Sequence, residues 1–191
     1  MKQTLLNLTK AYLGECQARN RYTFYAKVAR DEGYEQIGEI FALTAEQEKA
    51  HGKRLFKFIN EIKENGDDIV VEASAPTTLG TTIENLKAAI VGETYENSIM
   101  YPEFAKIAEE EGLTDIANHL RSIAVAEGNH KERYEKFLAN VENKSVFKKS
   151  EETWWVCREC GYIHFGKEAP DKCPSCDHAQ AFYQVRGDLN Y

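Results

Sequence analysis

Two Glu-x-x-His pairs have the residue types and spacing to bind metal ions. Glu48 and His51 form the first pair, and Glu127 and His130 form the second pair 79 residues later. Residues three positions apart share one face of a helix, so a carboxylate and an imidazole at this spacing can bind the same ion. One such pair is common on helix surfaces by chance, whereas two copies favour a site for iron or manganese over a thiolate-type zinc site.

The two pairs belong to an internal repeat. Residues 26–33, AKVARDEG, recur as AKIAEEEG at residues 105–112, and this offset is again 79 residues. Coincidence can produce one short match. A sequence match and a ligand-type match that share one offset indicate instead that a helical hairpin has been duplicated.

Four long segments are rich in residues that lose little free energy on entering a helix. They are residues 4–32, 34–64, 82–111 and 114–140. Gly33, Asn65-Gly66 and Gly112 separate them, as helix ends require. Residues 66–81 are β-branched and carry Pro and Gly, which predicts a connection. Two hairpins joined by this long crossover predict an all-α, ferritin-like four-helix bundle over residues 1–140, although the lengths alone also fit a generic helical bundle.

Acidic residues interrupt the apolar face of every predicted helix. The Glu-x-x-His pairs do so in the second and fourth helices, and Glu15, Glu93 and Glu96 lie on the inner stripes of the first and third,. An isolated buried carboxylate is costly, so such groups are paired, neutralised or bound to metal. These acids face only two histidines and Arg19. A buried ion-pair network is one interpretation; the other is the known arrangement that holds two iron or manganese ions in bundle cores.

Tyr22 and Tyr101 follow Glu15 and Glu93 by about two helical turns and share their inner faces. Their hydroxyl groups are placed where they could hydrogen-bond to metal ligands or to bound peroxide, although buried tyrosines are more often packing residues. The repeat offset slips from 78 residues for the two glutamates to 79 for the two tyrosines. The extra residue predicts a π-bulge or a kink between positions 93 and 101, helped by Pro102, with ordinary helix bending as the alternative.

A separate small module is predicted at the C-terminal end. Residues 141–152 form a polar linker, and residues 153–191 are too few to bury a large core,. Four cysteines in two Cys-x-x-Cys units supply thiolates with the spacing of a tetrahedral metal site, which can staple such a module. They are Cys157, Cys160, Cys173 and Cys176.

The bulk composition limits the function classes. The chain has 191 residues, of which 42% are hydrophobic and 29% charged, and its formal net charge is −7. An acidic chain without a segregated basic patch is not expected to bind nucleic acid or an anionic membrane. No apolar run is long enough to span a bilayer, and residues 1–10 lack the apolar stretch of a secretory signal, which predicts a cytoplasmic protein.

Motifs spread over nearly the whole chain resemble those of the rubrerythrin family. They are GECQARNRY around Glu15, EQEKAH in the second helix, GETYEN in the third, AEGNH in the fourth, and CREC-GY with CPSC in the tail. The resemblance implies a non-haem diiron centre in the bundle and a rubredoxin-like domain in which the four cysteines hold one iron, Fe(Cys)4. A structural zinc ribbon uses the same four ligands, so zinc can substitute there.

The resemblance also implies which bundle residues bind iron. They are Glu15, Glu48, His51, Glu93, Glu96, Glu127 and His130. In the family one iron exchanges a glutamate for a histidine on reduction, which here implies Glu96 in the oxidised state and His51 in the reduced state. Ferric iron favours carboxylate and ferrous iron accepts imidazole more readily. For Glu96, the alternative is a neighbouring acid that never binds the metal.

The function that the resemblance implies is a peroxidase in oxidative-stress defence. It would reduce hydrogen peroxide to water at the diiron centre, with Tyr22, Tyr101, Glu96 and His51 around the reacting group. Electrons would return through Fe(Cys)4 from a donor such as rubredoxin or an NAD(P)H-dependent reductase. The family implies a homodimer in which the tail of one chain lies beside the diiron centre of the other. Alternatives are a ferroxidase or iron-storage protein, a metal sensor with zinc in its tail, and an oxygen-reducing diiron oxidase.

Overall fold

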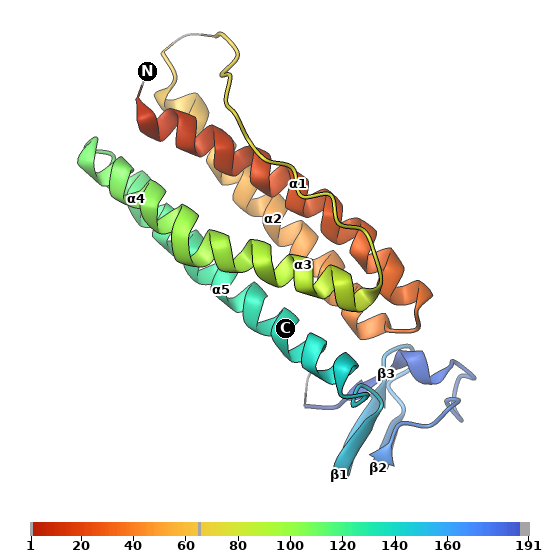
Figure 1. The fold of residues 1–191 in the computed structure, drawn as a ribbon. Helices are drawn as coiled ribbons and strands as arrows, with labels where there is room; N and C mark the ends of the chain where they lie inside the picture. Colours follow the sequence, from red (N-terminus) through yellow and green to blue (C-terminus); the bar gives the residue numbers. More distant parts are fainter. Residues whose placement is uncertain (1, 65, 188–191) are drawn as a thin grey trace.

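The computed structural model describes residues 2–64 and 66–187 and shows a helical bundle followed by a small β-sheet (Figure 1). The bundle elements are α1 (Gln3–Asp31), α2 (Glu35–Ile62), α3 (Thr82–Tyr95), the π-helix η1 (Glu96–Met100), α4 (Tyr101–Glu110) and α5 (Thr114–Glu142). Because α3, η1 and α4 follow one another without a break, the bundle has four rods, as predicted. Asn65, predicted to help end a helix, and residues 188–191 of the predicted C-terminal module lie outside the described residues.

Each hairpin turns at a glycine in the left-handed backbone region. The φ angle is 85° at Gly33 and 78° at Gly112, a conformation that side chains with a Cβ rarely adopt,. At the end of α1, the Tyr34 N–H donates to the Ala29 carbonyl at 2.8 Å. In the second hairpin, the Leu113 N–H donates to the Ala108 carbonyl, also at 2.8 Å. The two turns therefore share one geometry, as the sequence repeat predicts.

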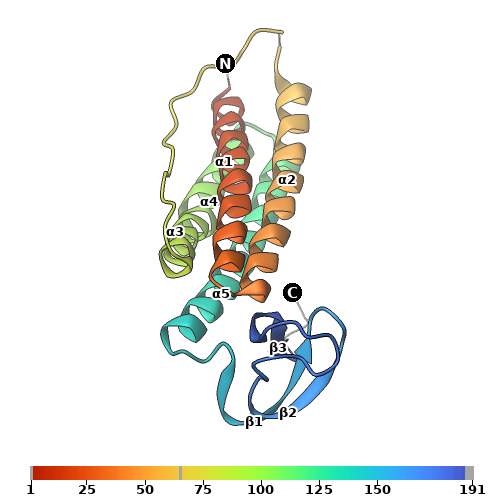
Figure 2. The same ribbon diagram turned by 90° about the vertical axis from the view of Figure 1, so that its right-hand side faces the viewer.

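The connection between α2 and α3 runs along α1 to the opposite end of the bundle (Figures 1 and 2). Tyr25 Oη donates to the Thr78 carbonyl at 2.8 Å, and Gly80 and Asn85 exchange hydrogen bonds of 2.9 and 2.8 Å. A capping box begins α3, in which Thr81 and the glutamate three residues later cap each other's backbone N–H groups,. The segment 66–81 is therefore a connection, as predicted.

The predicted irregularity in the third rod is a π-helix. It covers Glu96–Met100 and separates α3 from α4. A π-helical turn accommodates an added residue, so the helical phase after it is shifted. Because of this shift, Tyr101 is fully buried. It thus occupies the position that corresponds to Tyr22 in the first hairpin, as the repeat predicts. Pro102 lies in the first turn of α4, where its missing N–H is tolerated,.

Two apolar clusters fill the bundle on either side of its waist. Leu8, Leu55 and Leu120 belong to one cluster, and Tyr22 and Phe41 belong to the other. The Glu-x-x-His pairs lie between these clusters along α2 and α5. The acidic layer at the waist is therefore enclosed by apolar side chains at both ends, which keeps bulk water away from it.

The C-terminal module is a three-stranded antiparallel sheet with strand order β2-β1-β3. Its elements are β1 (Lys148–Cys157), β2 (Ile163–Glu168), the 3₁₀ turn η2 (Gln180–Phe182) and β3 (Tyr183–Val185). Its small core contains Trp155, Cys157, Cys173 and Tyr183. The irregular link is shorter than the predicted 141–152, because α5 extends to Glu142 and β1 begins at Lys148, where it pairs with Glu168. Polar, exposed residues can pair in a strand, and composition alone does not reveal it.

The sheet lies at the end of the bundle beside the α1–α2 turn (Figure 2). Arg158, between the first two cysteines, forms an ion pair with Glu39 of α2. The rings of Tyr34 and Phe147 stack with centroids 6.2 Å apart. The ion pair and the ring contact therefore both hold the module against its own bundle. Among the described helices, none combines the length and the apolar character needed to cross a membrane.

Candidate metal centres

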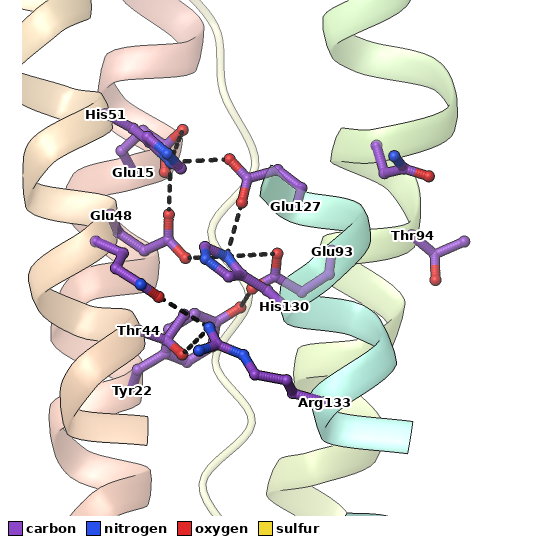
Figure 3. Close-up of polar contacts among 12 residues, drawn as sticks. Glu15, Tyr22, Thr44, Glu48, His51, Glu93, Thr94, Glu127, His130 and Arg133 are labelled. Atoms are coloured by element: carbon purple, nitrogen blue, oxygen red, sulfur yellow. Dashed lines mark hydrogen bonds and ion pairs between the residues drawn. The ribbon is translucent and has the colours of Figure 1, made fainter. Parts of the chain in front are cut away.

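All four rods bring acidic side chains to the waist of the bundle (Figure 3). α1 contributes Glu15, α2 contributes Glu48 and His51, α3 contributes Glu93, and α5 contributes Glu127 and His130. Each of the four glutamates is at most 1% exposed. The structure thus brings together six of the seven bundle residues proposed as ligands from the sequence.

The waist residues form two groups that share two carboxylates. One group contains Glu15 and His51, the other contains Glu93 and His130, and both contain Glu48 and Glu127. Within each group, the nitrogen and oxygen atoms that could bind a metal lie within 4.8 Å of one another. Two adjacent ion sites with two shared acids are therefore prepared by the side-chain positions alone.

The shared acids divide their oxygen atoms between the two histidines. His51 Nδ1 lies 3.1 Å from Glu48 Oε2 and 3.0 Å from Glu127 Oε1. His130 Nδ1 lies 3.1 Å from Glu48 Oε1 and 2.8 Å from Glu127 Oε2. Each carboxylate thus spans the two groups, an arrangement suited to bridging a pair of ions.

Several of these buried atoms meet only one another in the described part of the chain. Glu48 Oε1, Glu93 Oε2, both carboxylate oxygens of Glu127 and His130 Nδ1 are held by ion pairs with the two histidines, and Glu15 Oε2 has no hydrogen-bond partner. A buried polar atom without a partner costs about 1–3 kcal/mol, more if it is charged. Cations among these atoms would remove this cost. An oxygen-rich donor set with one imidazole per group fits a pair of iron ions.

In the metal-free protein, protons replace the missing positive charge. Burial raises the pKa of Glu93 to about 8. Burial also opposes the charged forms of Glu48, His51 and His130, but hydrogen bonds among the waist residues outweigh the effect of burial. The pKa of Glu48 therefore falls to about 2. The pKa of His51 rises to about 10 and that of His130 to about 12. Without metal, the two imidazoles are therefore cations at neutral pH, and the acids around them serve as their counter-ions.

The four cysteines of the C-terminal module form the second centre. Their sulfur atoms lie within 4.8 Å of one another, with Sγ–Sγ distances of 3.7 Å for Cys157–Cys176 and for Cys160–Cys173. Four sulfurs at about 2.3 Å from a central ion, in a tetrahedron, would be about 3.8 Å apart. The four thiolates therefore fit a single ion. The geometry suits iron and zinc equally.

Comparisons with known proteins identify the family. A family model described as Rubrerythrin matches residues 7–138, and a model described as the rubredoxin-like domain of rubrerythrin matches residues 155–184. The chain belongs to the rubrerythrin family. A putative rubrerythrin of Methanocaldococcus jannaschii is 55% identical over 97% of this chain and 94% of the relative. The rubrerythrin of Porphyromonas gingivalis is 49% identical over 95% and 89%, respectively.

A solved structure is similar over nearly the same length. Partially reduced nigerythrin has a TM-score of 0.64 and 34% identity, covering 97% of this chain and 87% of that chain. The matches confirm the predicted fold class, a ferritin-like bundle with a rubredoxin-like C-terminal domain. They also support the predicted cofactors of this rubrerythrin, a non-haem diiron centre and Fe(Cys)4.

The two tyrosines expected near the metal ligands each bind a glutamate of the other hairpin. Tyr22 Oη donates to Glu93 Oε1 at 2.5 Å, and Tyr101 Oη donates to Glu15 Oε1. Burial raises the pKa of both phenols well above their usual range, and the nearby carboxylates raise it further. Both phenols therefore stay protonated and act as donors. The pairing across hairpins fixes the position of one carboxylate in each group.

Glu96 lies outside both groups, in contrast to His51. Its carboxylate belongs to the π-helix η1 and faces α1, where a Cβ added at Gly14 would lie 3.9 Å from Glu96 Oε1. Burial raises its pKa well above the usual range, and repulsion from Glu93, Glu127 and Glu48 adds to this effect. The acid is thus near the waist but turned toward a pocket beside α1.

The prediction that Arg19 points inward, toward the acidic residues of the bundle, is wrong. Arg19 forms an ion pair of 3.5 Å with Glu46, and its side chain is 41% exposed. Arg133 is the buried arginine instead: it donates to Thr44 Oγ1 at 3.1 Å and to Gln47 Oε1 at 2.8 Å, linking α5 to α2. Sequence reasoning missed Arg133, although its spacing of three residues after His130 places it on the same helical face.

Proposed function

We propose that this rubrerythrin is a peroxidase that reduces hydrogen peroxide to water in the bundle and is re-reduced through Fe(Cys)4. Membership in the rubrerythrin family supports a diiron oxidoreductase with a role in oxidative stress. The observation that carries the proposal is the pair of ligand groups joined by Glu48 and Glu127. Two ions held by shared acids are close enough to act on one small molecule together.

The proposed ligands match ferrous ions in charge. They are Glu15, Glu48, His51, Glu93, Glu127 and His130. Their four carboxylates carry four negative charges, which balance two ferrous ions. When bound, the ions supply the two electrons that split the O–O bond of hydrogen peroxide, and two protons complete the two water molecules. The apolar clusters on both sides of the waist limit competition from bulk water.

Tyr22 and Tyr101 hold protons beside the reacting molecule in this proposal. Their raised pKa values keep both phenols protonated, and their bonds to Glu93 and Glu15 occupy one oxygen of each carboxylate. The other oxygen of each acid would then remain available to a bound ion. A fixed donor near the site also has no need to reorganise when charge develops on an oxygen atom.

Glu96 and His51 are proposed to exchange as ligands with the redox state. His51 lies in a ligand group and Glu96 does not, which is the arrangement expected for the reduced protein. Oxidation of the bound ions would add two positive charges. Glu96 is the further carboxylate beside the waist and would supply the additional oxygen ligand that ferric iron favours,.

Electrons are proposed to come from the Fe(Cys)4 domain of a partner chain in a homodimer. Within one chain this domain contacts α2 at Glu39, which lies nine residues before Glu48, or about 14 Å along the helix,. The cysteines lie beyond that contact. A partner chain could bring its domain nearer to the waist. The outside donor is proposed to be a rubredoxin or an NAD(P)H-dependent reductase.

The test uses the iron-loaded protein, reduced without oxygen. One equivalent of hydrogen peroxide or of oxygen is added, and the visible bands of both centres are followed by stopped flow. We expect peroxide to reoxidise both centres at least about tenfold faster than oxygen does. The opposite order would contradict the peroxidase proposal and favour a ferroxidase or an oxygen-reducing protein.

A further inference from the structure

A pocket of about 270 Å³ lies beneath the crossover, against the waist of the bundle. Its inner wall contains Lys10, Gly14, Gln17 and Arg21, which follow one another along one face of α1. Residues 72–76 of the crossover form part of its outer wall. Figure 1 shows the crossover passing along α1 toward the start of α3. The pocket is therefore a space enclosed by the bundle and its own connection.

Glu96 is one of the residues that line this pocket. α1 runs antiparallel to the α3–η1–α4 rod, since Tyr22 bonds Glu93 whereas Tyr101 bonds Glu15. Glu96 is consequently level with Gly14, whose missing side chain leaves room beside the carboxylate. The pocket thus reaches the acid that stands next to the metal ligands.

The lining combines polar and apolar side chains. Lys10, Arg21 and Glu72 line the pocket together with Glu96. The apolar side chains of Met100 and Phe104 also line the pocket, one and two turns beyond Glu96,. A lining of this mixed kind fits a molecule with a polar head and an apolar body.

The volume exceeds what hydrogen peroxide needs. One water molecule needs about 10–15 Å³ of cavity space, and hydrogen peroxide is about as large as two waters. The pocket's 270 Å³ therefore leaves room for a larger substituent on one oxygen.

A second pocket is lined by two of the proposed ligands. It lies between α1 and α2 and includes Glu15 and Glu48. A Cβ at Gly52 would meet the Glu15 Cβ at 3.5 Å and the Tyr12 ring at 3.8 Å. Gly52 thus lies against the carbon stem of Glu15, whereas Gly14, in the pocket beneath the crossover, lies against the Glu96 carboxylate.

We propose that the pocket beneath the crossover binds small organic hydroperoxides, ROOH, with the –OOH group at Glu96 and the organic group against Met100 and Phe104. This inference rests on the proposed peroxidase function and extends its substrate class. In the reaction the O–O bond breaks, two electrons from the reduced iron centre and two protons are consumed, and ROH and water leave.

The experiment compares cumene hydroperoxide with hydrogen peroxide on the iron-loaded full chain. Gln17→Phe places a ring into the pocket from the rigid wall of α1. Asn20→Phe adds the same ring on an exposed face of α1 outside the pocket and is the matched control. We expect kcat/KM for cumene hydroperoxide to fall at least about tenfold in Gln17→Phe, and to fall clearly less for hydrogen peroxide.

Calorimetric binding of 2-phenylpropan-2-ol, the alcohol that cumene hydroperoxide leaves, provides a second readout. We expect binding to the parent and to Asn20→Phe, with at least about tenfold weaker binding to Gln17→Phe. Equal binding to both variants, or no reaction with cumene hydroperoxide while hydrogen peroxide is reduced, overturns the inference. If hydrogen peroxide itself is not reduced, the proposed function fails, and binding of the alcohol still decides whether the pocket holds such molecules.

Discussion

Glu48 and Glu127 face each other across the bundle, and each directs one carboxylate oxygen to His51 and the other to His130. The relationship follows from the duplicated hairpin, since each acid occupies the same position in its own repeat. It makes the two ion sites interdependent.

Loss of a shared acid should therefore remove more iron than loss of an unshared one. We expect Glu127→Ala to lose both bundle ions, because each group loses a ligand. Glu93→Ala removes a ligand from one group and should retain the other ion. Elemental analysis measures iron per chain, with the Fe(Cys)4 absorption as an internal reference. Equal iron contents in the two variants would show that the acids are not shared.

Tyr22→Phe should slow the reaction with hydrogen peroxide by about 10–100-fold, as is typical when a group that orients a metal ligand is removed. The variant leaves Glu93 Oε1 without its donor. Single-mixing kinetics of the reduced protein measure the effect. Tyr25→Phe is the control, since Tyr25 bonds the crossover carbonyl of Thr78 rather than a metal ligand. A rate in Tyr22→Phe equal to that of this control would exclude the assigned role.

The metal-free protein should lose stability as the pH rises from 6 to 9. Glu93 has a pKa of about 8 instead of its ordinary 4.5, so its contribution is full below pH 4.5 and is lost as the pH rises through about 8,. His51 acts in the same direction: its contribution is full below pH 6.5 and is lost as the pH rises through about 10. Glu48 acts oppositely and loses its contribution only below pH 4.5.

Urea unfolding at several pH values measures this dependence. The iron-loaded protein is the comparison, because metal binding requires deprotonated ligands and so becomes stronger with rising pH. A metal-free protein that becomes more stable between pH 6 and 9 would contradict the protonation states described for the waist.

Cys173→Ser should abolish steady-state turnover with an external electron donor. It should leave intact the single-turnover reaction of the pre-reduced bundle with peroxide. The substitution removes one of four thiolates from a module with little core of its own, so the module should lose its iron and unfold,. Exposure of the buried Trp155 would be seen by fluorescence. Cys16→Ser is the matched control, because Cys16 lies outside the four-cysteine group. Unchanged turnover in Cys173→Ser would remove the C-terminal iron from the electron path.

Much of this architecture follows from local patterns in the sequence. Helix-forming composition and left-handed glycines such as Gly33 determine where the rods begin and end, and helical periodicity determines that Glu48 and Glu127 point inward. The one-residue slip between the repeats predicted a π-bulge or a kink between positions 93 and 101, and the π-helix Glu96–Met100 lies there. The first two features depend on residues close together in the chain and the third on a comparison of the two repeats, so spacing alone reveals them.

Other features required the packed bundle. The sharing of Glu48 and Glu127, the exclusion of Glu96 from both groups, and the burial of Arg133 in place of Arg19 depend on the rotation of each rod and on the side-chain torsions across it. Periodicity defines which face of a helix is buried but not which atoms on facing helices meet. The sequence by itself therefore determined the kinds of ligand at the waist, and only the tertiary structure decided how those ligands are divided between two ions.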